Sequence, residues 1–130
     1  MRKRILITED IEDLRTVLKT VVESLGYECL MASNGKEAVD MAASELPDVI
    51  MMDVMMPQMD GLTAAGIIRQ NPKTQSIPIL AVTVLNSHKK KQQCLESGYN
   101  DVINKPFTPS QLADRLEKLL KESSTKSSPF

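Results

Sequence analysis

Acidic, hydroxyl and amino side chains follow the short apolar segments of this chain at the points where those segments end. Glu9 and Asp10 come directly after one apolar run, and Asp53 ends another. Thr83 ends a third run, and Lys105 comes shortly after a fourth. If the runs are parallel strands, their carboxyl ends share one edge of a sheet, which is where open α/β folds place their chemistry. We therefore expect these five side chains to converge.

This set of side chains matches the requirements of phosphoryl transfer to a carboxylate. Three neighbouring carboxylates raise one another's pKa unless a cation lies between them. Hard oxygen ligands with room for water favour Mg²⁺. An ammonium group and a hydroxyl group can contact phosphoryl oxygens, while one carboxylate acts as the nucleophile. The alternative for Glu9 and Asp10 is simple capping of the following helix, where acidic residues are favoured.

The elements that position these residues alternate between two apolar periodicities. Short continuous apolar runs predict buried strands, and spacings of three and four predict amphipathic helices. Strands are expected at 4–8, 27–32, 49–53, 77–83 and around 102–103, and helices at 11–25, from 34 to about 44, from 60, up to about 98, and from 108. Such alternation predicts an α/β fold with a parallel sheet that is covered on both faces. A closed barrel needs about twice this length, so an open doubly wound sheet is favoured.

The composition limits the classes of protein to consider. The 130 residues carry a net charge of −1 and 42% hydrophobic content, which gives one core and no broad basic surface for nucleic acid. No secretion signal or membrane-length apolar segment is present, so a soluble cytoplasmic protein is expected. Cys29 and Cys94 have no metal-ligand or CxxC spacing and are interpreted as small core residues. Residues 1–122 are expected to form one domain, with 123–130 as a disordered polar tail or the start of a linker.

Four motifs together resemble the response-regulator receiver domains of two-component signalling, in particular the compact chemotaxis regulators. They are Ile-Leu-Ile-Thr-Glu9-Asp10, the segment from Asp53 to Asp60-Gly61, Thr83, and Asn-Lys105-Pro-Phe. The resemblance covers roughly residues 3–122. It implies a single flavodoxin-like domain with five helices and a five-stranded parallel sheet in the order 2-1-3-4-5.

The resemblance also implies a magnesium site. Asp10 and Asp53 would bind Mg²⁺ directly, together with the backbone carbonyl group of Met55. Glu9 would act through a metal-bound water.

The remaining roles concern the phosphoryl group. The resemblance makes Asp53 the phosphoacceptor and places Thr83 and Lys105 against the phosphoryl oxygens. It also implies a cis peptide bond between Lys105 and Pro106.

The partners that the resemblance implies are proteins. A sensor histidine kinase or a histidine phosphotransfer protein would supply the phosphoryl group, and a downstream output protein would receive the signal. A phosphorylation-linked homodimer also belongs to this set, whereas direct nucleic-acid binding and membrane attachment do not. The chain would catalyse only its own phosphorylation and dephosphorylation, so it is not expected to be an enzyme acting on other substrates.

The chain departs from the family pattern at Val102 and Val84, and the rim positions Leu85 and Met55 are apolar. Val102 stands where receivers commonly have a tyrosine or phenylalanine, so the coupling between Thr83 and the last strand should be weak or altered. Val84 replaces a small residue beside Thr83. With Leu85 and Met55, it places apolar side chains at the rim, which cannot orient an attacking water. Slow self-dephosphorylation is therefore expected.

Two other functions compete with this interpretation. A Mg²⁺-dependent phosphohydrolase with an aspartyl nucleophile typically has a second acid two residues later, but Met55 occupies that position. The chain also lacks an insertion large enough for a substrate cap. A receiver-like interaction module that works without phosphorylation would require the loss of a key residue, and only the aromatic residue at Val102 is missing.

Overall fold

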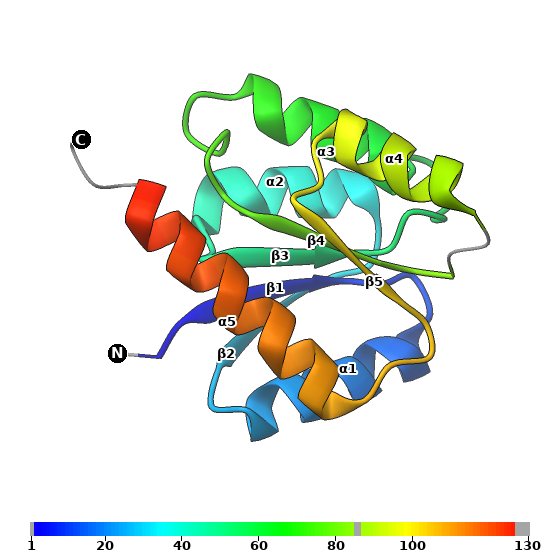
Figure 1. Cartoon of the computed structure of the whole chain (residues 1–130). Helices are drawn as coiled ribbons and strands as arrows, with labels where there is room; N and C mark the ends of the chain where they lie inside the picture. Colours follow the sequence, from blue (N-terminus) through cyan, green and yellow to red (C-terminus); the bar gives the residue numbers. More distant parts are fainter. Residues whose placement is uncertain (1, 85–86, 127–130) are drawn as a thin grey trace.

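Parallel strands and helices alternate regularly along the chain in the computed structural model, which describes residues 2–84 and 87–126. Within these residues, five strands form one sheet in the order β2-β1-β3-β4-β5, flanked by five helices (Figure 1). The elements are β1 (Arg4–Thr8), α1 (Glu12–Ser24), β2 (Glu28–Ala32), α2 (Gly35–Glu45), β3 (Val49–Met52), α3 (Gly61–Gln70), β4 (Ile79–Thr83), α4 (His88–Ser97), β5 (Asp101–Asn104) and α5 (Pro109–Lys126). The predicted flavodoxin-like fold and strand order are thus confirmed.

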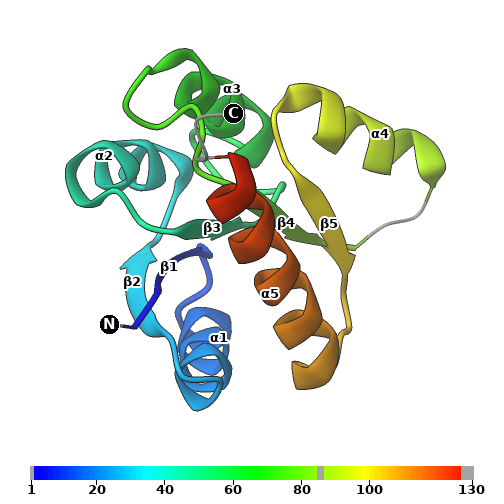
Figure 2. The same cartoon turned by 60° about the vertical axis from the view of Figure 1, so that its left-hand side comes forward.

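The two faces of the sheet carry separate hydrophobic clusters, because successive strand residues point to opposite sides. Leu6 and Ile50 belong to a cluster on the side of α2, α3 and α4. Ile7 and Met51 belong to the cluster on the side of α1 and α5. Figure 2 shows this division of the helices between the two faces. Burial on both faces explains why the central strands are apolar at nearly every position.

Side-chain caps begin three of the helices where the sequence predicts them. Asn34 accepts a hydrogen bond from the Glu37 N–H at 2.8 Å, and Asp60 caps α3 at the Thr63 N–H. Thr108 and Gln111 exchange reciprocal hydrogen bonds at the start of α5, as in a capping box. These caps fix the entry of each helix directly after a loop at the carboxyl edge of the sheet.

Some element boundaries differ from the sequence-based expectations. β4 begins at Ile79 and not at position 77, because Pro78 has no N–H group to donate to a strand neighbour. α5 continues to Lys126, four residues past the expected domain end at 122, while residues 127–130 lie outside the described part. The domain boundary itself stays a prediction. No helix in the described ranges is long and apolar enough to cross a membrane.

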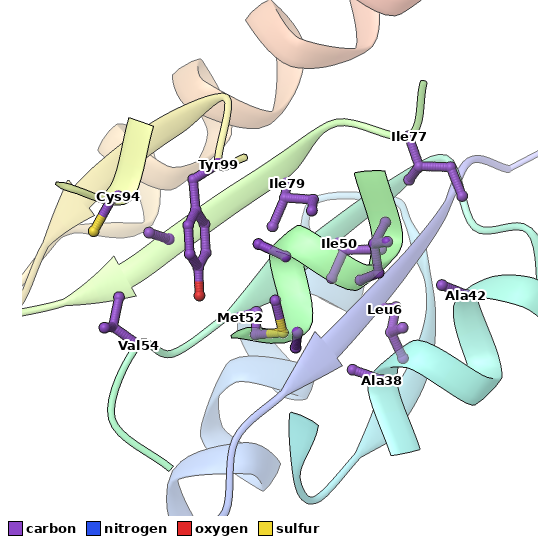
Figure 3. Close-up of a cluster of buried hydrophobic side chains, with 14 of the residues drawn as sticks. Leu6, Ala38, Ala42, Ile50, Met52, Val54, Ile77, Ile79, Cys94 and Tyr99 are labelled. Atoms are coloured by element: carbon purple, nitrogen blue, oxygen red, sulfur yellow. The ribbon is translucent and has the colours of Figure 1, made fainter. Parts of the chain in front are cut away.

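One aromatic ring lies inside the cluster on the α2–α4 side. Tyr99, between α4 and β5, is only 3% exposed and belongs to the same cluster as Met52, Val54 and Cys94. Figure 3 shows its ring among these side chains, with the hydroxyl group at the end nearer Met52 and Val54. A phenol at this depth places a polar group in the core directly below the end of β3.

Candidate functional site

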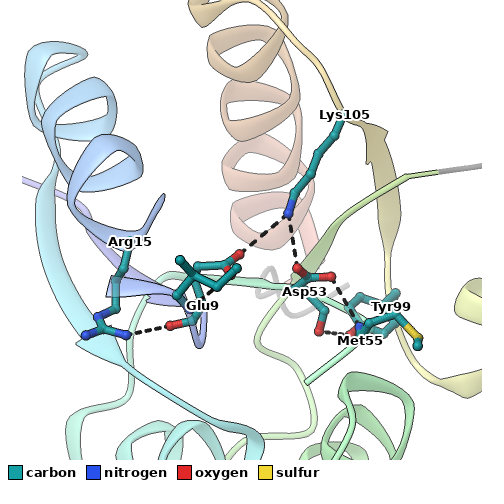
Figure 4. Close-up of polar contacts among 7 residues, drawn as sticks. Glu9, Arg15, Asp53, Met55, Tyr99 and Lys105 are labelled. Atoms are coloured by element: carbon teal, nitrogen blue, oxygen red, sulfur yellow. Dashed lines mark hydrogen bonds and ion pairs between the residues drawn. The ribbon is translucent and has the colours of Figure 1, made fainter. Parts of the chain in front are cut away.

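Two carboxylates and one ammonium group meet at the carboxyl edge of the sheet. The Nζ atom of Lys105 lies 3.1 Å from Oδ2 of Asp53 and 3.5 Å from Oε2 of Glu9 (Figure 4). These residues follow β5, β3 and β1, so three strand ends meet at one lysine, as the sequence predicts. The side chains of Glu9 and Asp53 are 2% and 12% exposed, which makes this a largely buried ionic cluster.

Glu9 is fixed by its own backbone surroundings. Its Oε1 atom accepts a hydrogen bond from the Ile11 N–H at 3.3 Å, and its carbonyl group accepts one from Arg15 at 2.7 Å. Burial raises the pKa of Glu9, and the nearby Asp53 and Asp10 carboxyl groups raise it further, whereas the Ile11 N–H and Lys105 lower it. Burial is the largest of these effects, so the pKa of Glu9 is raised overall.

Lys105 balances the cluster from the opposite side. Partial burial opposes its charge, but the Asp53 and Glu9 carboxylates outweigh this effect and raise the pKa of Lys105. Its backbone N–H donates to the Thr83 carbonyl group at 2.9 Å, which holds it beside the end of β4. The Lys105–Pro106 peptide bond is cis, as the resemblance implies.

Both carboxylate oxygens of Asp53 have donors. Oδ2 faces Lys105, and Oδ1 accepts a hydrogen bond from the Met55 N–H at 3.2 Å. The Asp53 N–H donates to the Thr8 carbonyl group at 3.3 Å, and the Asp53 carbonyl group accepts from the Tyr99 hydroxyl group. The side chain is therefore oriented through both its backbone and its carboxylate.

The other predicted site residues lie at the same edge. Asp10 is half-buried, and its carboxyl group lies close enough to Glu9 to raise the pKa of that residue. Thr83 is buried at the end of β4, where it pairs with Asn104. The side chain of Met55 is 70% exposed beside Asp53, so it belongs to the rim and not to the core. Val84 is also exposed, while Leu85 lies outside the described residues.

The donor atoms suit a hard divalent cation. Among residues 2–84 and 87–126, no three His, Cys, Asp or Glu side chains form a ready-made metal cluster. Glu9 and Asp53 nevertheless place two largely buried carboxylates against the Lys105 ammonium group, and the Asp10 carboxyl group lies beside Glu9. Carboxylate and carbonyl oxygens are the ligands that Mg²⁺ prefers. The charge excess and the oxygen chemistry both fit this ion.

Three contacts of the site are absent from the sequence-based prediction. Tyr99 and Arg15 hold the backbones of the two buried acids, and Lys90 donates to the Val84 carbonyl group at 2.9 Å. The signal available for Tyr99 was a tyrosine two residues before a strand, since a buried hydroxyl group requires a partner. Arg15 and Lys90 gave no signal, because solvated helix faces commonly carry such residues.

An apolar groove of about 520 Å³ adjoins the ionic cluster. It lies between α1 and the segment leading into α5, and Glu9 and Lys105 form part of its lining. Its apolar walls include Leu14, Val17, Leu18, Val21 and Phe107. Leu14 and Val17 are 43% and 57% exposed, so this surface is open to a partner.

Comparisons with known proteins agree with this geometry. Residues 5–117 match the model of the response regulator receiver domain. The chain is 39% identical over 119 residues to response regulator PleD of Caulobacter vibrioides, covering 92% of this chain and 26% of PleD. It spans between a quarter and a half of the length of most of the curated relatives it matches.

Solved structures show the same similarity. The crystal structure of a putative response regulator from Chloroflexus aurantiacus has a TM-score of 0.88 and 34% identity, covering 93% of this chain and 99% of that one. The receiver domain of the sensor histidine kinase PA1611 from Pseudomonas aeruginosa has a TM-score of 0.87 and 31% identity, with 93% and 99% covered. That structure holds a magnesium ion in its active-site cleft. With the family model matched over most of its length, the chain belongs to the response regulator receiver domains of two-component signalling.

Proposed function

We propose that this chain is a phosphorylation-controlled switch in which Asp53 accepts a phosphoryl group. The observation that carries the proposal is the Lys105 ammonium group held between Asp53 and Glu9 at the carboxyl edge of the sheet. Asp53 is the nucleophile because its carboxylate contacts Lys105 and each of its two oxygens accepts a hydrogen bond that orients it.

The reaction consists of one substitution at phosphorus. An Asp53 carboxylate oxygen forms a bond to phosphorus while the bond between phosphorus and the donor breaks. From a phosphohistidine donor, the electron pair of the broken P–N bond returns to the imidazole ring, which can then take up a proton. Lys105 remains charged in this process and stabilises the phosphoryl oxygens, and Thr83 donates its hydroxyl hydrogen to one of them.

A magnesium ion fits the carboxylate side of the cluster. Asp10, Asp53 and the Met55 carbonyl group would hold it, with Glu9 acting through a bound water. When bound, the ion neutralises charge that develops on the phosphoryl oxygens. The magnesium ion in the PA1611 receiver domain supports this assignment.

The experiment uses a small phosphodonor. Wild-type protein is incubated with acetyl phosphate and Mg²⁺, and its intact mass is compared with that of Asp53→Ala. Wild type should gain one phosphoryl group, and the variant should gain none. Equal gains, or a gain that persists with EDTA, would contradict the proposal.

The physiological donor is proposed to be a histidine kinase or histidine phosphotransfer protein that rests a helix in the apolar groove beside α1. Glu9 and Lys105 line this groove and Lys105 contacts Asp53, so a helix lying in it could bring its phosphohistidine close to Asp53. Val17→Glu should slow transfer from such a protein but leave phosphorylation by acetyl phosphate unchanged. A variant that loses both reactions equally, or neither, would argue against this docking surface.

The signal of the phosphorylated protein is proposed to reach a protein partner or a second copy of the chain. The coupling between Thr83 and β5 that carries this signal is altered in this chain. Val102 is buried opposite Ala81 of β4 and has no ring that could turn inward behind Thr83. The expected response to the phosphoryl mimic beryllofluoride is therefore a small movement of α4. A family-like shift of α4 in structures with and without the mimic would refute weakened coupling.

A further inference from the structure

The hydroxyl group of Tyr99 reaches the backbone of the phosphoacceptor from inside the core. Tyr99 follows Gly98, the residue that ends α4, and its N–H donates back to the Cys94 carbonyl group at 3.1 Å. The ring is 3% exposed, and its Oη atom lies 3.3 Å from the Asp53 carbonyl oxygen. The phenol therefore connects the junction of α4 and β5 to the residue that carries the reactive carboxylate (Figure 4).

Gly61 leaves the space in which this contact forms. A Cβ atom at Gly61 would collide with both the Tyr99 hydroxyl group and the Asp53 carbonyl oxygen. The Gly61 N–H meanwhile donates to the Val54 carbonyl group at 2.9 Å. The two peptide groups that follow β3 are thus held by different donors, one from Tyr99 and one from the start of α3.

We propose that Tyr99 is a positioning residue for the phosphoacceptor, acting through its hydrogen bond to the Asp53 carbonyl group. This bond fixes the peptide plane between Asp53 and Val54, and with it the direction in which the Asp53 side chain leaves the backbone. The backbone continues from this peptide group to Met55, whose N–H donates to Oδ1 of Asp53. The inference rests on the proposed function, because it assigns a residue that orients the nucleophile of that reaction.

Packing alone does not account for this hydroxyl group. The surrounding cluster is apolar, and a phenylalanine ring would fill the same volume without bringing a polar group below the site. Burial raises the pKa of Tyr99, with smaller contributions from the charges of Cys94 and Asp53, so the phenol stays protonated and can donate. A buried donor and a buried carbonyl group thus satisfy each other at the end of β3.

The test compares Tyr99→Phe with the control Tyr27→Phe. Tyr27 is a half-buried tyrosine that packs against the other hydrophobic cluster, on the α1 and α5 side. Two quantities are measured: the carbonyl ¹³C chemical shift of Asp53 by NMR, and the rate of phosphorylation by acetyl phosphate at saturating Mg²⁺. Tyr99→Phe should move the Asp53 resonance upfield. It should also slow phosphorylation by roughly two- to fivefold, the lower part of the range for one neutral hydrogen bond, because 3.3 Å is long for such a bond.

The half-saturation concentration for acetyl phosphate separates positioning from structural damage. It should stay unchanged in Tyr99→Phe, because the hydroxyl group does not contact the donor. Placing 4-aminophenylalanine at position 99 restores a donor and should recover the rate. If Tyr99→Phe does not fold, 3-fluorotyrosine in the Tyr27→Phe background replaces it, and its more acidic hydroxyl group should move the resonance downfield.

The outcomes distinguish the two proposals. If wild type phosphorylates and Tyr99→Phe does so at the same rate, or if the Asp53 resonance does not move, the positioning role is wrong. If wild type itself gains no phosphoryl group, the proposed function fails. The chemical shift then still decides whether the hydrogen bond exists.

Discussion

Replacing Lys105 with methionine should change three properties of the site in different directions. Methionine keeps most of the length of the side chain but removes the charge that lies between Glu9 and Asp53. The variant should be less stable without metal, should bind Mg²⁺ more tightly, and should phosphorylate more slowly. All three effects follow from the same two contacts.

The loss of stability follows from the distances and the exposure. At 3.1 Å the gross attraction between Lys105 and Asp53 is about 5 kcal/mol for an effective dielectric constant of about 20. Because 27% of the Lys105 side chain is exposed and exposed pairs retain about 0.2–1 kcal/mol, most of this attraction is screened. Two contacts to largely buried partners therefore predict a loss of about 1–2 kcal/mol. Urea denaturation in EDTA measures it.

Metal binding and reaction rate should respond oppositely. The ammonium group and Mg²⁺ compete for the same carboxylates and repel each other, so removing the ammonium group should strengthen Mg²⁺ binding by roughly threefold to tenfold. The phosphorylation rate should fall by about 10²-fold, because a preorganised positive group no longer stabilises the phosphoryl oxygens. Isothermal titration calorimetry and phosphate-affinity gels measure these two effects.

The control is Lys118→Met, which removes an exposed lysine from α5 far along the chain from the cluster. It should leave all three properties unchanged. A Lys105→Met protein that phosphorylates at the wild-type rate, or that binds Mg²⁺ more weakly than wild type, would refute the electrostatic reasoning.

Three further predictions concern the rim, the thiols and the core. Met55→Asn should shorten the lifetime of the phosphorylated protein by roughly tenfold, because an amide can orient the attacking water, whereas Met55→Leu should leave it unchanged. Burial, aided by the charge of Glu23, raises the pKa of Cys29 to about 11. Alkylation of the native protein by iodoacetamide at pH 8 should therefore be about a hundredfold slower than in urea, and its rate should still increase above pH 9. Equal rates in the native protein and in urea would exclude this pKa. Arg69→Met should lower the free energy of unfolding by about 2–4 kcal/mol, because the guanidinium group donates to the carbonyl groups of Gly98, Gln75 and Ile77. A loss below about 1 kcal/mol in urea denaturation would contradict this prediction.

The placement of the reactive groups could be predicted because it follows from backbone topology. Glu9, Asp53 and Lys105 each come after an apolar run, and parallel strands bring such positions to one edge whatever the details of packing. The caps at Asn34 and Asp60 were predictable for a similar reason, since each depends on residues within one turn.

The contacts that depend on distant side chains could not be predicted in the same way. The hydrogen bond from Tyr99 to Asp53 joins residues 46 positions apart and exists only because α3 presents a glycine at that point. The shared contact of Lys105 with both acids depends on rotamers that no local pattern encodes. The end of α5 was also missed, because its last residues are polar and lack the apolar stripe from which the helix was predicted.

Chemical trapping of the modified residue tests the central claim most directly. Sodium borohydride reduces an aspartyl phosphate to homoserine and releases phosphate, so the modified position can be read by peptide mass spectrometry after treatment with acetyl phosphate and Mg²⁺. Homoserine should appear at position 53 alone. Homoserine at position 10 or 60, or a phosphate group that survives reduction on a serine or threonine residue, would show that the chemistry lies elsewhere.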